Sequence, residues 1–354
     1  MNPVELARPE IRALQPYASA RSLADSAGIL LNANENPWPP AADQGLGLNR
    51  YPDPQPAALR QRLAEIYEVE ESQLLITRGS DEGVDLLIRV FCRAGHDQVL
   101  ICPPCFGMYG LSATVQNAAV VQVPLIETNG DWGLDFEGLE QAPPCRLYFL
   151  CSPNNPTGNL IDPKTVLDLA DRVAGHGLVV IDEAYVEFCE QDSLAAQVSA
   201  RPNLVVLRTL SKACALAGCR IGAVIADPAV IDLLRRIIAP YPLPTPSVIA
   251  ALAALTPEEL DRQREQRERL AQLKIRLLNQ LREHPAVRDI WPGAANFVLI
   301  RSDQAKQLMN DALAAGIRLR DQSRQRGLDG CVRITIGSDD EMQRLAEFLR
   351  EWRP

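Results

Sequence analysis

The 354-residue sequence predicts an α/β protein with a large domain, built on a mainly parallel β-sheet, and a smaller α/β domain. The first observation is that short apolar or β-branched runs alternate with helical patterns from about residue 55 to 240, as expected of βα units around a parallel sheet. The second is a proline-rich segment, residues 240–246, which cannot continue a helix and is followed by a different pattern. The chain is also longer than one compact domain usually is.

The first 50 residues are irregular and rich in proline. They contain turn-forming sequences such as Asn36-Pro37, and they read as an arm laid over another part of the molecule. Together with the proline-rich segment, this predicts three regions. They are an N-terminal arm over residues 1–30 that contributes to the small domain, a large domain over residues 31–243 and a small C-terminal domain over residues 244–354.

Short runs in the large domain are expected to form strands, because each is apolar or β-branched and lies between turn or helix patterns. They are residues 74–76, 99–102, 120–123, 147–151, 178–181, 204–207 and 221–226. After the proline-rich segment, a long charged helical stretch is expected at residues 248–283. The small domain is then expected to contain strands at residues 297–300, 317–319 and 332–336, and helices at residues 303–314 and from residue 339 onward.

The charge and the cysteines of the chain limit its partners and its compartment. A formal net charge of −9 provides no positive field for nucleic acid or for an anionic membrane surface. The N-terminus lacks a signal-peptide pattern, and no apolar stretch approaches the roughly 18 residues of a membrane span. Nine cysteines without framework spacing fit reduced thiols. We therefore expect a cytoplasmic protein that binds neither nucleic acid nor membrane.

One cysteine pair, Cys102 and Cys105, has the spacing of a zinc or redox motif. A metal site would need a second such pair or nearby histidines, and the histidines, His96, His176 and His284, are scattered along the chain. We interpret the segment as a strand end followed by a proline turn, and we expect no metal.

The residues around Lys212 suggest carbonyl chemistry. Lys212 follows the strand expected at residues 204–207, and small or apolar residues flank it on both sides. Partial burial would lower the pKa of its amine and free it to attack a carbonyl, as a Schiff-base lysine must. On its own, this pattern fits better a lysine that extends from a strand end into solvent.

Polar residues follow two other expected strands. Asp182 and Tyr185 come after the strand at residues 178–181, and Asn155 lies in a proline-rich turn after the strand at residues 147–151. Ligands of a parallel sheet bind beyond the carboxyl ends of its strands, so these side chains would share a crevice with Lys212. The alternative is a turn-capping aspartate and a tyrosine at the rim.

Two features suggest anion binding. Ser80 and Asp81 precede an amphipathic run and indicate a helix N-terminus, whose free N–H groups and dipole attract a phosphate, although an ordinary N-cap explains them equally well. Arg320 and Arg333 lie at the ends of two expected strands, where guanidinium groups suit a carboxylate or a phosphate. Composition alone favours solvated surface arginines.

Several motifs, in their order and spacing, resemble a known family. Ser-Pro-Asn-Asn-Pro-Thr-Gly at 152–158, Val-Ile-Asp-Glu-Ala-Tyr at 180–185 and Thr-Leu-Ser-Lys at 209–212 resemble the fold-type I aminotransferases, which depend on pyridoxal 5′-phosphate. Within that group the chain is similar to the histidinol-phosphate aminotransferases, on motifs at residues 31–37, 51–56, 78–82, 319–322 and 332–337. The resemblance covers about residues 12–340 and implies the two-domain fold of these enzymes.

The resemblance implies roles for residues around the cofactor. Lys212 would hold pyridoxal 5′-phosphate as a Schiff base, and Asp182 would pair with the pyridine nitrogen and keep the ring protonated as an electron sink. Asn155 and Tyr185 would bind the phenolic oxygen of the cofactor, and Tyr109 would stack on its ring. The phosphate would be held by Ser80, Asp81, Ser211 and Arg220, together with Tyr51 from the neighbouring subunit of a homodimer.

On the substrate side, the resemblance implies that Arg333 meets the anionic group beside the reacting carbon. Arg320 and Tyr17 would help to bind the substrate phosphate, with Asn34 also at the substrate. The implied reaction transfers an amino group from L-histidinol phosphate to 2-oxoglutarate, which gives imidazole acetol phosphate and L-glutamate in L-histidine biosynthesis.

Three alternatives stay open. Phosphothreonine decarboxylases share most of these motifs and also bind a phosphorylated amine, and an aromatic aminotransferase is a second rival enzyme. A regulator that binds pyridoxal phosphate would need a DNA-binding extension, and no helix-turn-helix precedes the matched region.

Overall fold

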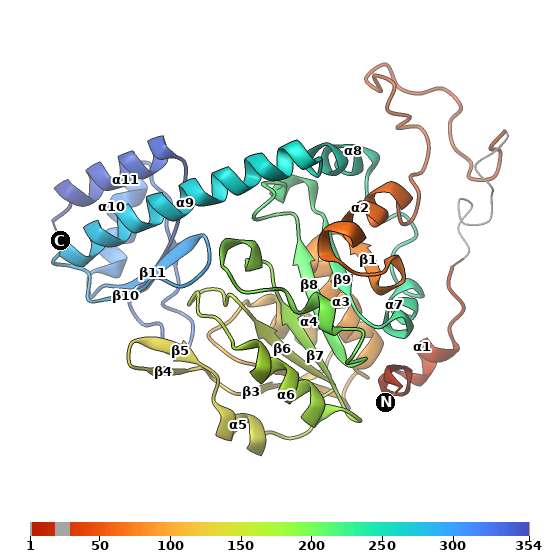
Figure 1. Ribbon diagram of the computed structural model, residues 1–354, viewed down its shortest axis with the longest axis horizontal. Helices are drawn as coiled ribbons and strands as arrows, with labels where there is room; N and C mark the ends of the chain where they lie inside the picture. The colour runs from red at the N-terminus through yellow and green to blue at the C-terminus, as the bar shows by residue number, and fades with distance from the viewer. Residues whose placement is uncertain (1, 18–28, 354) are drawn as a thin grey trace.

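The computed structural model describes residues 2–17 and 29–353, and its centre is a seven-stranded β-sheet (Figure 1). The strand order is β1-β9-β8-β7-β6-β2-β3. All neighbouring strands run parallel except β9, which is antiparallel to both β1 and β8. The strands are β1 (Leu74–Thr77), β2 (Gln98–Ile101), β3 (Ala119–Gln122), β6 (Leu147–Cys151), β7 (Leu178–Asp182), β8 (Leu204–Thr209) and β9 (Gly222–Ile225). Each strand expected in the large domain is found, with small differences at its ends.

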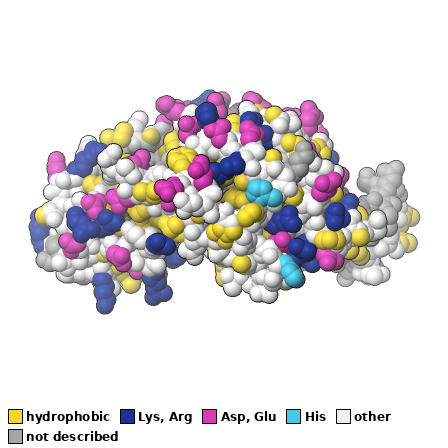
Figure 2. Space-filling view, turned by 90° about the horizontal axis from the view of Figure 1, so that it is seen from below, with side chains coloured by type: hydrophobic (Ala, Val, Ile, Leu, Met, Phe, Trp, Pro, Cys, Tyr) yellow, Lys and Arg dark blue, Asp and Glu magenta, His cyan; other side chains and the backbone are white. Residues whose placement is uncertain are grey.

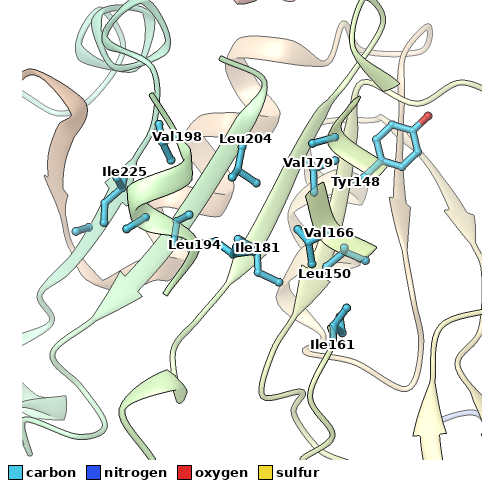
Figure 3. Packing of buried hydrophobic residues seen from close by; sticks show 14 of the residues in the cluster. Tyr148, Leu150, Ile161, Val166, Val179, Ile181, Leu194, Val198, Leu204 and Ile225 are labelled. Carbon is cyan, nitrogen blue, oxygen red and sulfur yellow. The ribbon is translucent and has the colours of Figure 1, made fainter. Parts of the chain in front are cut away.

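Helices cover both faces of this sheet. One face is covered by α3 (Gly79–Phe91), α4 (Met108–Val115) and α7 (Pro228–Arg235), and the other by α2 (Ala57–Tyr67), α5 (Phe136–Gln141), α6 (Pro163–Val173) and α8 (Thr245–Ala254). Successive residues of a strand point to opposite faces. In β7, Val179 and Ile181 therefore pack into one core, shown in Figure 3, and Leu178 and Val180 into the other. Burial on both faces explains the uninterrupted apolar runs of the central strands.

The small domain is built on a four-stranded antiparallel sheet of order β10-β11-β13-β12. The long helix α9 (Pro257–Glu283) runs from the large domain to this sheet (Figure 1). The other elements are β10 (Asp289–Trp291), β11 (Phe297–Arg301), α10 (Ala305–Ala314), β12 (Arg320–Asp321), β13 (Cys331–Thr335) and α11 (Asp339–Glu351). Apolar residues of α9, α10 and α11 form one core with the sheet.

Several details differ from the expectations. The helical stretch expected at residues 248–283 is two helices, because the Thr256 side chain caps the start of α9 and Pro257 occupies its first turn. The strand expected at residues 317–319 lies instead at β12, since the Ile317 N–H still closes the end of α10 by donating to the Ala312 carbonyl at 2.8 Å. Two structures were not expected, a short hairpin of β4 (Ile126–Thr128) and β5 (Asp131–Gly133), and the edge strand β10.

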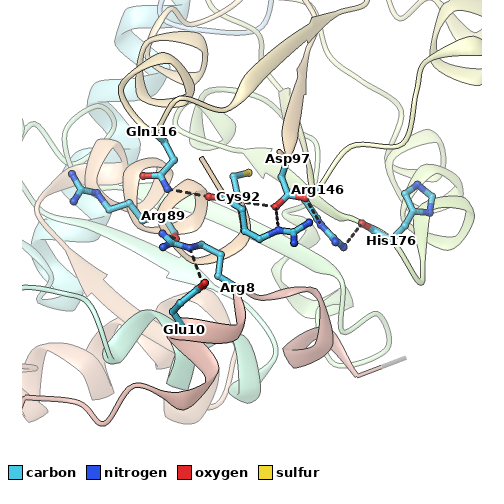
Figure 4. Close-up of polar contacts among 9 residues, drawn as sticks. Arg8, Glu10, Arg89, Cys92, Asp97, Gln116, Arg146 and His176 are labelled. Carbon is cyan, nitrogen blue, oxygen red and sulfur yellow. Dashed lines mark hydrogen bonds and ion pairs between the residues drawn. The ribbon is translucent and has the colours of Figure 1, made fainter. Parts of the chain in front are cut away.

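The first described residues pack on the large domain. The 3₁₀ helix η1 (Pro3–Leu6) contacts α7, and α1 (Pro9–Ala13) follows it. Between them, the Arg8 backbone N–H donates to the carbonyl of Val90 in α3 at 2.9 Å, and the Arg8 guanidinium donates to the preceding carbonyl at 3.0 Å (Figure 4). This position differs from the small-domain position expected for the arm. Residues 1 and 18–28 of that arm lie outside the described residues.

Three further observations concern the surface and the thiols. Across the described residues, no helix is both long and apolar enough to cross a membrane. On the face shown in Figure 2, Lys and Arg side chains are interspersed with Asp and Glu side chains. All nine cysteines, Cys102 and Cys105 among them, are free thiols.

Candidate active site

A cavity of about 660 Å³ opens where the carboxyl ends of the parallel strands face the small domain. The loops after β6, β7 and β8 converge here because these strands run parallel and end at the same edge of the sheet. Most of the residues expected at the site line the cavity. They are Ser80, Asp81, Asn155, Asp182, Tyr185, Ser211, Lys212 and Arg220 from the large domain and Arg320 and Arg333 from the small domain.

Lys212 lies in the loop after β8, with its amine 5.7 Å from the centre of the Tyr185 ring. Burial, assisted by the positive charge of Arg333, lowers the pKa of the Lys212 amine. A lower pKa increases the fraction of neutral amine, which is the form that attacks a carbonyl. Lys212 remains exposed to the cavity, so the site presents an accessible amine of lowered pKa.

Asp182 is the last residue of β7 and is almost completely buried. The Tyr109 hydroxyl donates to its Oδ2 at 2.7 Å, and the Ala184 N–H donates to its Oδ1 at 3.1 Å. Burial raises the pKa of Asp182 to about 6, although the hydrogen bond from Tyr109 opposes this effect. No Lys or Arg among residues 2–17 and 29–353 forms an ion pair with this carboxylate, so it suits a cationic group of a ligand.

Asn155, Tyr185 and Arg333 form a polar group on another wall of the cavity. The Asn155 amide donates to the Tyr185 hydroxyl at 3.4 Å, and its Oδ1 accepts a hydrogen bond from the Arg333 guanidinium. Burial raises the pKa of Tyr185 well above its usual value, so the hydroxyl stays protonated at neutral pH. An amide N–H and a phenol O–H are both donors, and together they can bind one anionic oxygen.

The N-terminus of α3 and Arg220 form a first anion site. Arg220 donates to the Ser211 hydroxyl at 3.3 Å and to the Asp81 carboxylate at 3.1 Å. Gly79, at the start of α3, has a φ of +75°, and a Cβ atom there would lie 2.5 Å from the Arg220 guanidinium. A side chain at residue 79 would therefore displace the Arg220 guanidinium from the helix start. Free helix N–H groups beside a guanidinium are typical of a phosphate site.

Arg320 and Arg333 form a second anion site in the small domain. They are paired across β12 and β13, so their side chains stand next to each other. Burial lowers the pKa of Arg333, and the neighbouring Arg320 adds to this effect. The Arg333 Nε is buried without a hydrogen-bond partner in the described part of the chain. Two adjacent guanidinium groups favour an anionic ligand.

Tyr109 is not where the resemblance implied. It lies in the first turn of α4, completely buried, and its ring stacks on Phe149 at 4.9 Å instead of lining the cavity. Phe106 lines the cavity in its place. The physical reason is position in the chain, because Phe106 belongs to the loop after β2 and faces the crevice, whereas α4 turns its Tyr109 face toward the sheet.

Tyr17, Asn34 and Tyr51 do not line the cavity of their own chain. Tyr51 is half exposed and stacks on Tyr241, with ring centres 4.4 Å apart. Tyr17 and Asn34 are both exposed. Their roles in binding stay predictions.

Sequence reasoning missed Gln322 and Gln325, which also line the cavity. The Gln325 amide donates to Gln322 Oε1 at 2.9 Å. Strand alternation is the signal that could have identified Gln322, because it follows Arg320 by two residues and so shares its face. Thr209, another missed residue, ends β8 and donates to the Ser211 hydroxyl at 2.9 Å.

Comparison with known proteins identifies the family. A family model described as Aminotransferase class I and II matches residues 26–349. The chain belongs to this family. A histidinol-phosphate aminotransferase from Cronobacter sakazakii is 44% identical over 349 residues, which are 98% of this chain and 96% of the relative.

Two solved structures have the same fold as this chain. The histidinol-phosphate aminotransferase from Sinorhizobium meliloti in complex with pyridoxal-5′-phosphate has a TM-score of 0.75 and 26% identity, and the match covers 90% of this chain and 89% of that one. The L-threonine-O-3-phosphate decarboxylase from Porphyromonas gingivalis has a TM-score of 0.73 and 25% identity, over 86% of this chain and 90% of that one. The α/β fold class expected from the sequence is confirmed.

The donor set of this aminotransferase fits pyridoxal 5′-phosphate. The first anion site suits its phosphate, the buried Asp182 suits a protonated ring nitrogen, and the Asn155 and Tyr185 donors suit its phenolic oxygen. Lys212 offers an amine of lowered pKa in the same cavity. Each group of the cofactor therefore has a chemically matched partner among the lining residues.

Proposed function

We propose that the protein transfers the amino group of L-histidinol phosphate to 2-oxoglutarate, which gives imidazole acetol phosphate and L-glutamate, in the biosynthesis of L-histidine. The observation that best supports this function is the presence of two anion sites in one cavity, one from each domain. The cofactor phosphate needs one site. A donor with a phosphate-bearing arm needs the other, and the carboxylates of glutamate fit the same pair of guanidinium groups.

Bound pyridoxal 5′-phosphate supplies an electrophilic carbonyl carbon and a ring that accepts the electron pair released from the substrate carbon. Lys212 would bind that carbonyl carbon through Nζ until the substrate amine displaces it. Burial lowers the pKa of Nζ. Once freed, Nζ can take the proton from the substrate carbon and deliver it to the former carbonyl carbon of the cofactor. Asp182 would hold a proton on the ring nitrogen, and Asn155 and Tyr185 would bind the phenolic oxygen.

The remaining residues would position the cofactor and the substrate. We assign ring stacking to Phe106 rather than Tyr109, because Phe106 lines the cavity. The backbone N–H groups of Ser80 and Asp81, the Ser211 hydroxyl and the Arg220 guanidinium would bind the phosphate. Arg333 and Arg320 would bind the anionic groups of the substrate.

We further propose that the enzyme is a homodimer in which each cavity receives the partner subunit's Tyr51. This proposal is supported by the position of Tyr51 outside the cavity of its own chain. The segment that precedes it also exposes large apolar side chains, among them Ile29, Leu31 and Trp38, and such surfaces usually mark an interaction site. The nine free thiols suit a reducing compartment, so we place the enzyme in the cytoplasm. We also propose domain boundaries near residues 30 and 243.

A substrate panel tests this function. The purified protein would be given 2-oxoglutarate with histidinol phosphate, phosphothreonine, phenylalanine or aspartate, and glutamate formation would be measured, with Lys212→Ala as the inactive control. We expect the highest kcat/KM with histidinol phosphate. Carbon dioxide release from phosphothreonine without glutamate formation would show a decarboxylase instead. A preference for phenylalanine would show an aromatic aminotransferase.

A further inference from the structure

A fully buried tyrosine lies directly behind the carboxylate that faces the cavity. The Tyr109 hydroxyl donates to Asp182 Oδ2 at 2.7 Å, and the two residues are 73 positions apart in the sequence. Tyr109 does not line the cavity, so it cannot touch a ligand there. Its only polar atom is directed at Asp182.

The ring of Tyr109 is held on two sides. It stacks on Phe149 at 4.9 Å with an interplanar angle of 8°, and it meets Phe106 edge to face at 5.6 Å. Complete burial leaves the side chain no free volume in which to turn away. The hydroxyl is therefore fixed on the carboxylate, and Tyr109 also supports Phe106 from behind.

The charge of Asp182 depends on this bond. Burial is the dominant effect and raises the pKa of Asp182 to about 6, and the Tyr109 hydrogen bond is the strongest opposing effect, ahead of the Ala184 N–H. Two charged groups also act on Asp182: Asp81 raises its pKa and Lys212 lowers it. Burial also raises the pKa of Tyr109 well above its usual value, so its hydroxyl keeps its proton at neutral pH. A phenol that keeps its proton beside a carboxylate acts as a donor, and donation favours the ionised carboxylate.

We propose that Tyr109 is a positioning residue that keeps Asp182 ionised and directed into the cavity, so that Asp182 can hold a proton on the ring nitrogen of the bound cofactor. This proposal rests on the cofactor assignment made under the proposed function. It gives Tyr109 a role different from ring stacking, and this role acts through Asp182.

The test replaces Tyr109 with phenylalanine, which keeps the ring and its stacking and removes only the hydroxyl. The full-length apoproteins would be titrated with pyridoxamine 5′-phosphate, which binds without reacting with Lys212. The titrations would be repeated at several pH values from roughly 5.5 to 8.5, a range that includes the pKa of Asp182. We expect Tyr109→Phe to weaken binding by about two- to tenfold at pH 7, because loss of the donor raises the pKa of Asp182 and leaves more of this carboxyl protonated at that pH. As the pH is lowered, the affinity of the variant should begin to fall at a higher pH than that of wild type, because loss of the donor raises the pKa of Asp182.

Two comparisons separate this role from packing. A phosphorylated analogue whose ring nitrogen is replaced by carbon has nothing for Asp182 to hold, so it should bind wild type and Tyr109→Phe equally well. In an Asp182→Asn background, Tyr109→Phe should have little further effect, since the charge it stabilises is already absent. Tyr148→Phe is the matched control, because Tyr148 is also a buried tyrosine, but its hydroxyl bonds to Cys145 and His176.

Each outcome has a definite meaning. An unchanged pH profile in Tyr109→Phe, an equal loss for the carbon analogue, or the full effect in the Asp182→Asn background would overturn the role of Tyr109. If wild type binds pyridoxamine 5′-phosphate but does not transaminate histidinol phosphate, only the proposed substrate fails. If wild type does not bind the probe at all, the cofactor assignment fails and the Tyr109 proposal fails with it.

Discussion

At the scale of single residues, Lys212 and Lys274 provide a test of the amine that binds the cofactor. Burial lowers the pKa of both amines, that of Lys274 to about 8. Only Lys212 lines the cavity, however, and the Lys274 amine donates to the carbonyls of Gly293 and Ala295. We expect borohydride reduction of the protein loaded with pyridoxal 5′-phosphate to attach the cofactor permanently to one lysine. Peptide mapping should place this label on Lys212. Lys212→Ala should not be labelled, and Lys274→Ala should be labelled like wild type; a label on Lys274 in wild type would contradict the assignment.

Asp182 predicts a pH dependence of stability in the apoprotein. An aspartate has a pKa of about 3.9 in an unfolded chain, whereas burial raises that of Asp182 to about 6. An acid whose pKa is raised by folding destabilises the folded state once it is ionised. Wild type should therefore lose roughly 2–3 kcal/mol from this group as the pH rises from about 4 to 6, and no more above that.

Asp182→Asn lacks this titration. Denaturant unfolding of the two apoproteins at several pH values should show the stability difference shifting in favour of the variant between about pH 4 and 6. Asp329→Asn, at an exposed site, should show no such shift. If the free energies of unfolding of wild type and Asp182→Asn changed with pH in parallel, folding would not raise the pKa of Asp182.

At the scale of elements, the start of α3 depends on glycine. Gly79 and Gly130 both have a positive φ, +75° and +79°, but only Gly79 faces the Arg220 guanidinium. We expect Gly79→Ala to lower the free energy of unfolding by about 1–3 kcal/mol and to weaken pyridoxal-phosphate binding by about tenfold or more. Gly130→Ala should cost only about 1 kcal/mol, with normal cofactor binding. Equal cofactor affinity in the two variants, measured by dialysis, would contradict a phosphate site at this helix.

The pairing of β12 with β13 makes a second prediction at this scale. If Arg320 binds the substrate phosphate, Arg320→Ala should reduce kcat/KM by roughly ten- to a hundredfold for histidinol phosphate and much less for histidinol. Arg320→Lys should retain part of the activity, because lysine supplies a charge without the planar fork. Arg318→Ala, exposed and outside the cavity, is the control. An equal loss on both donors would show that Arg320 supports the site generally.

At the scale of the whole molecule, a homodimer with shared sites can be tested by mixing two inactive variants. A Lys212→Ala subunit still provides Tyr51, and a Tyr51→Ala subunit still provides Lys212. A mixed dimer would then contain one complete site, so refolding an equal mixture should restore about a quarter of wild-type activity. The measurement is activity against mixing ratio, and an absence of complementation would show that Tyr51 does not act across the interface.

The sequence determined much of this molecule because local patterns have local physical causes. Strands buried on both faces are mostly apolar, so β6, β7 and β8 could be predicted from their apolar runs within a few residues. Parallel strands end at a common edge, so Asn155, Asp182 and Lys212 could be predicted to converge. These inferences needed no knowledge of how distant segments meet.

Only the tertiary structure decided which side chains face each other. Phe106 and Tyr109 are both aromatic and three residues apart, and the sequence does not say that α4 begins between them and turns Tyr109 away from the cavity. The bond between Tyr109 and Asp182 and the pairing of Arg320 with Arg333 depend on register and helix orientation. The pKa of Lys212 depends on burial in the same way. Such properties come from distances between segments far apart in the chain, and local residue patterns do not specify those distances.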